Sequence, residues 1–288
     1  GGFSNNVSCN CSVIVGGHNN SNGGTTSFIG GGRNNIINSG ANCSSITAGY
    51  YNSISGCLHN SIGAGCQNTI NATTYGTSNR IGGGQLNDIR GTNVSYNTIP
   101  GGWCNKLCDT YCSTIAGGRS NCIKDQHLST IGGGGSNYVC GRASTITGGE
   151  NNCICNGAYG CASILGGCNN RICTAPFASA VGLANIVNHS CSHAIGAGLT
   201  STTTLTTYMN NATVACHLQV GGTTTLNTTT GRIDATNDVI SFATSDRRLK
   251  ENIKPIENAL CKVIGVSGNT FDWKPLTKEE IQTIHGNS

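Results

Sequence analysis

The groups that can do acid–base chemistry gather near the C-terminal end of this 288-residue chain. Thirteen charged residues occupy the thirty-five positions 246–280, whereas positions 1–231 contain twelve. The charged segment is preceded by a serine, Ser245, and a lysine, Lys250, follows five residues after it. Such a pair is chemically sufficient to generate a nucleophile, because a neutral amine can accept the hydroxyl proton. An exposed lysine has a pKa of about 10.4, so burial or a neighbouring arginine must lower the pKa before the amine can act as a base.

The long segment before residue 230 offers little for general acid–base catalysis. Its acidic residues form no column that recurs along the chain. They are Asp88, Asp109, Asp125 and Glu150. Hydrolysis of a glycosidic bond needs two carboxyl groups that face one groove. A glycan-cleaving enzyme is therefore an alternative rather than the main hypothesis, and we expect no metabolic activity.

Eighteen cysteines raise the question of metal binding, but none of them forms a CxxC pair. Cys104, Cys108 and Cys112 are four residues apart, and Cys153 and Cys155 are two apart. These spacings do not match those of zinc sites. We expect most of the cysteines to be small buried apolar residues in a chain made in a reducing cytoplasm, and we expect no metal and no other cofactor.

The overall composition also limits the partners. Glycine accounts for 43 residues, charged residues for 10% of the chain, and the net charge is +4. Because this small positive charge is spread over the chain, the sequence predicts no nucleic-acid surface. No apolar run reaches the length that spans a membrane. Low charge combined with many β-branched residues argues against a disordered chain.

A repeat of 15 to 19 residues fills most of the chain. Each of its ten copies has an isoleucine, a glycine three residues later and an asparagine six residues later, and nine of the ten have an apolar residue eight residues later. The isoleucines are Ile14, Ile29, Ile46, Ile62, Ile81, Ile99, Ile115, Ile131, Ile146 and Ile164. The asparagines are Asn20, Asn35, Asn52, Asn68, Asn87, Asn105, Asn121, Asn137, Asn152 and Asn170.

This spacing predicts an all-β fold, a parallel β-solenoid or β-roll rod over residues 1–199. Identical residues at identical offsets stack in ladders when successive turns coil in parallel. The glycines permit a corner with positive φ, and asparagine both tolerates a left-handed corner and can hydrogen-bond its equivalent in the next turn. The absence of a 3.6-residue period excludes a helix. At about 4.8 Å per strand, about twelve turns give a rod of roughly 60 Å.

Each turn contributes only about two good apolar residues, which is a thin core for so long a rod. We therefore expect a homotrimer in which three chains pack their isoleucine ladders together.

The position directly after the glycine pair varies in residue type from repeat to repeat, whereas the positions on either side of it are nearly constant. Its occupants are His18, Arg33, Tyr50, Cys66, Gln85, Trp103, Arg119, Gly135, Glu150 and Cys168. We expect these side chains to project from the corner into solvent. They are either unconstrained surface positions or a contact row for a host receptor. The members best suited to contact a receptor are Tyr50, Trp103, Arg119 and Glu150.

The character of the sequence changes after the repeats. Residues 200–244 are threonine-rich with loose alternation, which predicts short strands in a β stalk or knob. Residues 245–288 are predicted to be a small α-rich segment. Its first helix contains Pro255 in the first turn and ends at Gly265, and a second helix opens at a capping box that begins with Thr277.

The Ser-x-Ile-x-Gly-Gly units of residues 1–199 resemble the head repeats of trimeric autotransporter adhesins. They resemble even more closely the Gly-Gly-Gly/Asn repeats of bacteriophage tail fibres. The resemblance implies a trimeric rod that attaches to a host cell surface. A bacterial trimeric surface adhesin and a β-helical tailspike that depolymerises glycans stay open as alternatives. The chain opens in the middle of a repeat, so we expect further turns before residue 1.

The stretches SDRRLKENIKPIENAL, from Ser245, and GNTFDWK, from Gly268, closely resemble the C-terminal intramolecular chaperone of endosialidases and tail fibres, a self-cleaving peptidase. The resemblance implies that Ser245 is the nucleophile, that Lys250 is its general base, and that the bond between Thr244 and Ser245 is cut. It further implies a clamp that trimerises the fibre, other virion or tail proteins as partners, and a place in the virion after assembly in the host cytoplasm. Because that family's domain is longer, we expect the sequence to continue.

Overall fold

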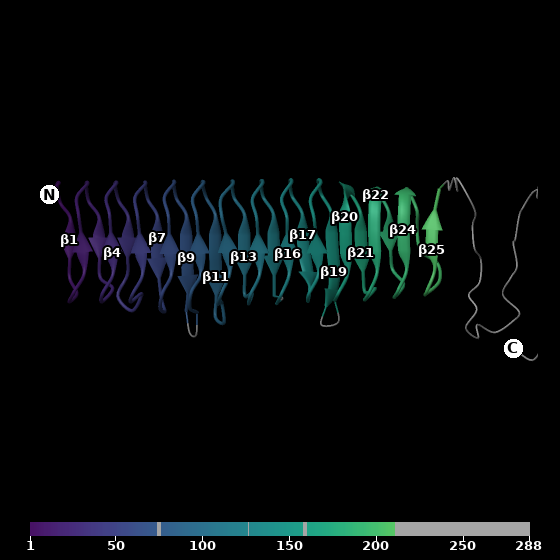
Figure 1. The fold of residues 1–288 in the computed structure, drawn as a ribbon, viewed down its shortest axis with the longest axis horizontal. Helices are drawn as coiled ribbons and strands as arrows, with labels where there is room; N and C mark the ends of the chain where they lie inside the picture. Colours follow the sequence, from purple (N-terminus) through teal and green to yellow (C-terminus); the bar gives the residue numbers. More distant parts are fainter. Residues whose placement is uncertain (74–75, 126, 158–159, 211–288) are drawn as a thin grey trace, which may run out of the picture. The chain divides into compact units, whose positions relative to one another are not determined.

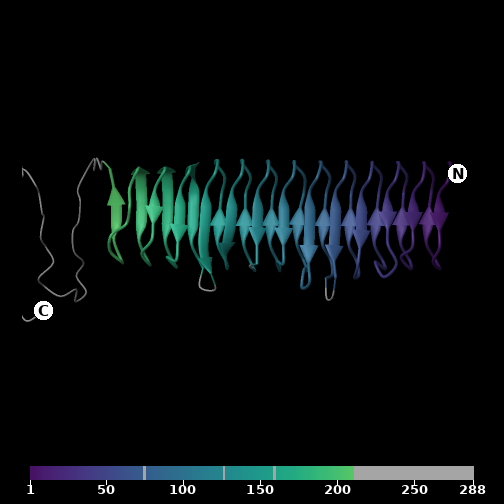
Figure 2. The ribbon, with the colours of Figure 1, turned by 180° about the vertical axis from the view of Figure 1, so that it is seen from behind.

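The computed structural model describes residues 1–73, 76–125, 127–157 and 160–210, which fall within one compact unit, Gly1–Ala212. These residues form two parallel sheets and contain no helix. The chain alternates between the two sheets with every half-turn, so that strands stack side by side along the unit (Figure 1). The same stack is seen from behind in Figure 2. The predicted parallel β-solenoid of about twelve turns is thereby confirmed.

The twelve-stranded sheet, here sheet 1, contains β1 (Asn6–Val7), β3 (Ser21–Asn22), β5 (Ile36–Ile37), β7 (Ser53–Ser55), β9 (Thr69–Ala72), β11 (Asp88–Gly91), β13 (Lys106–Cys108), β15 (Cys122–Lys124), β17 (Tyr138–Gly141), β19 (Cys153–Gly157), β21 (Arg171–Cys173) and β23 (Ile186–Val187). The thirteen-stranded sheet, here sheet 2, contains β2 (Val13–Ile14), β4 (Phe28–Ile29), β6 (Ser45–Ile46), β8 (Ser61–Ile62), β10 (Arg80–Ile81), β12 (Thr98–Ile99), β14 (Thr114–Ile115), β16 (Thr130–Ile131), β18 (Thr145–Ile146), β20 (Ser163–Cys168), β22 (Ser179–Leu183), β24 (His193–Ala197) and β25 (Thr207–Met209).

The core lies between the two sheets and is complete within one chain. Sheet 2 contributes the repeat isoleucines and sheet 1 contributes the apolar residues eight positions later, as Ile115 and Ile123 illustrate; both are 0% exposed. The premise that three chains pack their isoleucine ladders together is therefore wrong, since these side chains are already buried. Buried polar side chains at the two corners fill the cross-section that two apolar residues alone would leave open.

The first corner, here the glycine corner, is fixed by the asparagine ladder. The side-chain amide of Asn121 donates to Asn105 Oδ1 in the preceding turn at 3.1 Å, to Gly117 O at 3.0 Å and to Gly134 O at 3.0 Å. Its own Oδ1 accepts the backbone N–H of Asn137 in the following turn at 3.0 Å. The predicted ladder is confirmed, and each amide joins three consecutive turns.

The left-handed positions of this corner differ from the prediction. The second glycine of each pair has positive φ, as expected, for example +98° at Gly17. The other left-handed residue is the one before the ladder asparagine, such as Asn19 or Tyr51, and not the asparagine itself. The ladder asparagine keeps ordinary φ because its amide must point inward, where all its hydrogen-bonding groups find partners.

The opposite corner, here the loop corner, is less regular. The spacing from a ladder asparagine to the next repeat isoleucine varies from nine residues, Asn20 to Ile29, to thirteen, Asn68 to Ile81. A second buried column lies two residues before each repeat isoleucine from Ile29 onward, and it includes Ser113, Ser129 and Asn97. The structure therefore has one corner of constant length and one that absorbs insertions.

The described part of the chain extends beyond the repeats. Strand β25 pairs in parallel with β24, so sheet 2 continues into the threonine-rich segment predicted as a stalk or knob. The rest of that segment and the two predicted helices lie outside the described residues. Within the described residues, no helix has the length and apolar character needed to cross a membrane.

Candidate functional site

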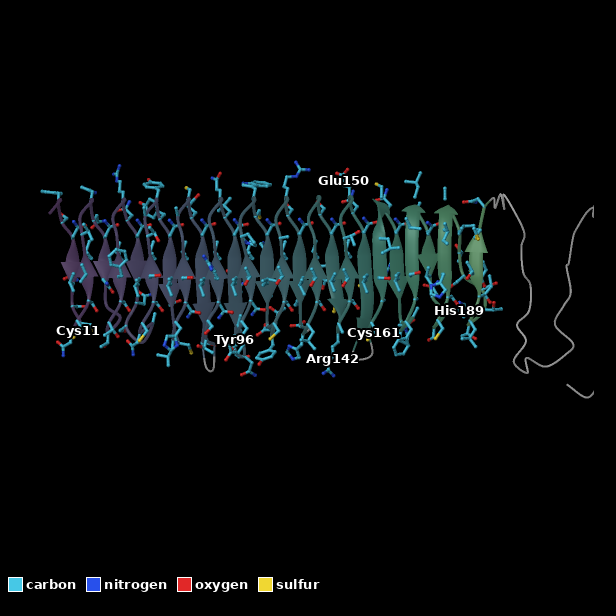
Figure 3. The ribbon with its side chains drawn as sticks, viewed as in Figure 1. Cys11, Tyr96, Arg142, Glu150, Cys161 and His189 are labelled. Carbon is cyan, nitrogen blue, oxygen red and sulfur yellow. The ribbon has the colours of Figure 1, made fainter. Side chains whose placement is uncertain are left out.

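The variable row predicted from the sequence runs along the glycine corner. Its members are joined turn to turn by parallel bridges from His18 to Cys168. Tyr50 and Trp103 are 41% and 44% exposed, and Arg119 and Glu150 are exposed as well. Figure 3 shows Glu150 projecting from the upper edge of the stack. The expectation that these side chains face solvent is confirmed for these four residues, whereas Cys66 and Cys168 in the same row are half-buried.

The backbone explains why this position tolerates almost any residue. Trp103 donates its N–H to Gly118 O at 2.9 Å, and its carbonyl accepts from Ser120 N at 2.9 Å. Both backbone groups are thus held by the adjacent turn, whatever the side chain is. Because the side chain points away from the corner, its chemistry is free to vary without loss of stability.

The four residues predicted to contact a receptor are not one cluster. Trp103 and Arg119 are on adjacent turns. Two other row positions, Cys66 and Gln85, separate Tyr50 from Trp103, and Gly135 separates Arg119 from Glu150. Near the N-terminus the row has contacts of its own, with the Arg33 guanidinium 5.9 Å from the ring centre of Tyr50. The best candidate patch is therefore the Trp103–Arg119 pair.

A second exposed row lies at the loop corner and was missed by the sequence reasoning. The rings of Tyr96 and Tyr111 meet edge to face with centroids 5.6 Å apart, and Tyr111 meets His127 in the same way at 6.0 Å. Tyr96 and Arg142 project from the edge opposite Glu150 (Figure 3). Counting residues back from each repeat isoleucine would have revealed most of this row, because Tyr111, His127 and Arg142 lie four residues before it, whereas Tyr96 lies three before Ile99.

The acidic residues of the rod do not form a catalytic pair. Asp109 and Asp125 follow β13 and β15 at the same offset, so these two acids do recur on adjacent turns. However, Asp109 Oδ1 accepts the Thr92 N–H at 3.0 Å, and Asp125 lies 3.7 Å from Lys124 with about half of its side chain exposed. Both carboxylates are exposed, so neither has the buried setting that keeps a general acid protonated.

Asp88 is the acid whose surroundings are unusual. Burial raises the pKa of its carboxyl, although Arg90, 3.1 Å away, and Lys106 act in the opposite direction. Its Oδ1 is buried without a hydrogen-bond partner. The side chain lies directly after the ladder asparagine Asn87, on the outer face of sheet 1.

The cysteines do not occupy the buried positions expected from the sequence. All sixteen that the structure describes are half-buried or exposed, and none is disulfide-bonded. The core positions are filled by isoleucine ladders and by hydrogen-bonding asparagines and serines, which leaves the outward columns for cysteine. No group of three or more His, Cys, Asp or Glu side chains in the described part of the chain is arranged to hold a metal ion.

Six of the cysteines gather on the outer face of sheet 1. We call them the thiol strip: Cys108, Cys122, Cys140, Cys153, Cys155 and Cys173. A hydrogen bond from the Cys122 thiol, supported by Arg90, lowers the pKa of Cys108 to about 6. Burial, and then its neighbour Cys155, raises the pKa of Cys153 to about 12. Cys153 Sγ and Cys155 Sγ are 3.3 Å apart.

Comparison with known families concerns the C-terminal segment. Residues 245–286 match the family model described as chaperone of endosialidase. The match includes Ser245 and Lys250, and the predicted bond between Thr244 and Ser245 falls at its first residue. The three residues themselves lie outside the described part of the chain. No curated protein matches the sequence. A β-solenoid followed by an endosialidase-type chaperone segment is consistent with a protein of the tail-fibre or tailspike type.

Proposed function

We propose that the chain belongs to a trimeric fibre on a virus particle, a bacteriophage tail fibre, that attaches the particle to its host cell. The observation that supports this most is the order of the two parts: a rigid solenoid of about twelve turns, then a chaperone match at residues 245–286. The rod would extend from the particle and present exposed side chains to the host surface, and the chaperone segment, which we call the clamp, would assemble the three chains. The other partners would be virion or tail proteins and a receptor on the host surface.

The proposed clamp solves a problem that the repeats create. Parallel ladders of near-identical turns can slip by one whole turn without losing their pairing pattern, and non-local pairing nucleates slowly. A trimeric chaperone segment would hold three chains in register while each rod winds. Because each isoleucine ladder is buried within its own chain, the clamp would bring the three chains together, and their outer faces rather than a shared core would hold the finished fibre.

In this proposal the clamp removes itself after assembly. The Ser245 hydroxyl gives its proton to the neutral amine of Lys250 and attacks the carbonyl carbon of Thr244. The C–N bond between Thr244 and Ser245 breaks, Lys250 returns the proton to the released amine of Ser245, and an ester joins Thr244 to Ser245. Water then hydrolyses this ester, which leaves a carboxylate on Thr244 and restores the Ser245 hydroxyl. Closing three chains over Lys250 would desolvate its amine and lower its pKa, so cleavage would wait for assembly. This is one turnover per chain and requires no cofactor.

The cleavage proposal is tested by expressing the complete gene and following its products by denaturing electrophoresis and N-terminal sequencing. The wild type should give a large fibre fragment and a small C-terminal fragment that begins at Ser245. Ser245→Ala and Lys250→Ala should stay uncut, while the matched controls Ser241→Ala and Lys254→Ala are cut normally. Light scattering should report three chains per particle in every variant. Cleavage of Ser245→Ala at the wild-type rate would refute the assignment.

The attachment proposal is tested on the two edges of the rod. The double variant Trp103→Ala with Arg119→Ala should reduce binding of labelled fibres to host cells by about tenfold or more, if the pair behaves as a binding hot spot. The matched control, Tyr111→Ala with His127→Ala, changes the opposite edge. If the first variant binds as well as the wild type, the receptor contact does not lie on the glycine corner.

A further inference from the structure

The thiol strip on sheet 1 has a geometry that distinguishes its members. Two outward positions flank each buried residue of a strand, because successive side chains alternate between the two faces of a sheet. In β19 and β21 the buried residues are Ile154 and Ile172, which are register partners and 0% exposed. The cysteines that follow them, Cys155 and Cys173, are register partners as well and lie on the outer face.

From this placement we infer that Cys155 and Cys173 form a site of disulfide modification that covalently links two consecutive turns of the solenoid. Register partners on adjacent strands have Cα atoms about 4.8 Å apart. A disulfide requires Cα atoms roughly 4.4–6.8 Å apart, so the bond can close with little backbone movement. The inference does not depend on the attachment role.

The other thiols of the strip are not register partners of a cysteine. Cys140 follows Val139, which pairs with Ile154, but the register shifts directly after that pair, so Cys140 has no register partner in β19. Cys108 and Cys122 are diagonal neighbours, because Cys108 faces Lys124 and Cys122 faces Lys106. Diagonal neighbours in a sheet are about 7–8 Å apart, near or beyond the limit of about 7 Å for a disulfide. This pair is therefore an internal control: its thiols are close enough to share a hydrogen bond, yet their backbones are too far apart to be bridged.

Cys153 is the competing partner for Cys155, since their sulfurs are 3.3 Å apart. Two observations favour Cys173 instead. Cys153 and Cys155 are two residues apart on one extended strand, about 6.6 Å by the usual rise, at the far end of the range for a disulfide. In addition, the raised pKa of Cys153 keeps its thiol protonated, whereas exchange requires a thiolate. Cys173 Sγ, by contrast, accepts a hydrogen bond from Arg171 Nε at 2.9 Å.

The chemistry balances with a low-molecular-weight disulfide as oxidant. The Cys173 thiolate attacks one sulfur of glutathione disulfide, which forms a mixed disulfide and releases one glutathione. The Cys155 thiolate then attacks Cys173 Sγ, which forms the protein disulfide and releases the second glutathione. Two protein thiols are oxidised, one glutathione disulfide is reduced, and the two protons end on the two released glutathione thiols.

The bond would brace a turn that departs from the regular pattern. The pairing of β17 with β19 shifts register between Val139 and Gly141, and that of β20 with β22 shifts between Ile164 and Gly167. A link from residue 155 to residue 173 encloses one turn that contains Ile164 and Gly167, the site of the second shift. The thiols would stay reduced while the chain winds in a reducing compartment, and the link would close in an oxidising one.

The experiment uses the folded protein, purified under reducing conditions and then incubated with glutathione disulfide. After acid quenching and alkylation, trypsin cuts at Arg142, Arg171 and Arg232, so that peptides 143–171 and 172–232 contain the two cysteines. Mass spectrometry should find these peptides joined, with the loss of two hydrogens and fragment ions that place the bond on Cys155 and Cys173. Peptides 107–119 and 120–124, which hold Cys108 and Cys122, should not be joined.

Cys173→Ser and Cys155→Ser should each abolish the joined peptides without changing the far-ultraviolet circular dichroism of the rod. Oxidation should raise the melting temperature of the wild type by about 5 °C or more, as expected for closing a loop of this length, and leave both variants unchanged. Three results would overturn the inference: a Cys153–Cys155 bond within peptide 143–171, glutathione on Cys173 without the cross-link, or equal cross-linking in urea-unfolded protein.

Discussion

The two corners of the solenoid perform the same task by different means. At the glycine corner every repeat has asparagine at the inward position, and its amide makes hydrogen bonds to three turns. At the loop corner the equivalent inward column is mixed, with Ser129 and Asn97 as members and with Ala162 and Ala178 in two turns. One corner thus depends on a specific side chain and the other does not.

The difference follows from the lengths of the two corners. The glycine corner has constant length, so its polar backbone groups recur at the same places and a ladder of identical amides can satisfy all of them. The loop corner varies in length, so no single side-chain type can reach the same backbone groups in every turn. Backbone hydrogen bonds between turns, such as that from Ala143 N to His127 O at 2.9 Å, occur there as they do at the glycine corner. A corner that absorbs insertions cannot also require one residue type.

The largest expected effect comes from blocking the close approach of turns at the glycine corner. A Cβ on Gly118 would lie 2.2 Å from Gly134 O and 2.7 Å from Asn121 Nδ2, at a φ of +86°. We expect Gly118→Ala to cost on the order of 3 kcal/mol or more, because strain and steric overlap add. Its neighbour Gly117 has nothing within 4 Å of the corresponding position.

Gly117→Ala is therefore the matched control, with a change in the free energy of unfolding of about 0.5 kcal/mol or less. Urea denaturation of both variants measures the difference. Equal midpoints for the two variants would mean that the turns can separate at this corner without loss, and the contrast between the corners would have no steric basis.

A smaller but more specific effect is expected from the two polar columns. Asn121→Ala removes three donated bonds and leaves the buried N–H of Asn137 without its acceptor, so we expect a loss of about 2–4 kcal/mol. Ser129→Ala removes a bond to Gly141 O at 2.7 Å and longer ones, and we expect about 1 kcal/mol. Calorimetry or urea denaturation that ranked the two variants in the opposite order would contradict the comparison.

The fold was predictable because the glycine corner is the same in all ten repeats. The fixed distances from Ile115 to Gly118 and Asn121, copied in each of these repeats, determine the pairing, the parallel direction and the buried ladder. The left-handed residues before the asparagines were not predictable, because Asn19, Tyr51 and their equivalents share a conformation but no side-chain type. There the hydrogen bonds of adjacent turns impose the conformation on whatever residue is present.

The candidate site was only partly predictable for a related reason. The row that includes Trp103 was found because it has a constant offset from the glycine pair. The Tyr96–Tyr111–His127 row lies on the corner of variable length, where offsets counted forward along the repeat drift from turn to turn. The prediction of a core shared by three chains was wrong, because it did not count the buried polar columns that fill the cross-section of a single chain.

The smallest expected effect comes from a buried polar group to which the asparagine ladder gives no hydrogen bond. Asn87 belongs to the ladder, and Asp88, next to it, has a buried Oδ1 without a partner. Burial raises the pKa of Asp88 above 3.8, so the folded state holds the proton more tightly than the unfolded state. Stability should therefore fall as pH rises from the unfolded pKa to the folded one, and the penalty should be complete at pH 7.

Asp88→Asn keeps the shape and removes that ionisation, so its melting temperature should exceed that of the wild type at pH 7, and the difference should shrink as the pH is lowered toward 3.8 and stay constant below it. Loss of attraction to Arg90 matters little, since about half of that side chain is exposed. Asp125→Asn, at an exposed carboxylate, is the control and should follow the wild type. Melting curves recorded from pH 3 to pH 8, roughly the range over which such a carboxyl titrates, decide the matter. If the curves of Asp88→Asn and the wild type run parallel over that range, attraction to Arg90 and Lys106 offsets the cost of burying the Asp88 carboxylate. The buried Oδ1 of Asp88 would then cost the fold no more than the fully hydrogen-bonded asparagines of the ladder beside it.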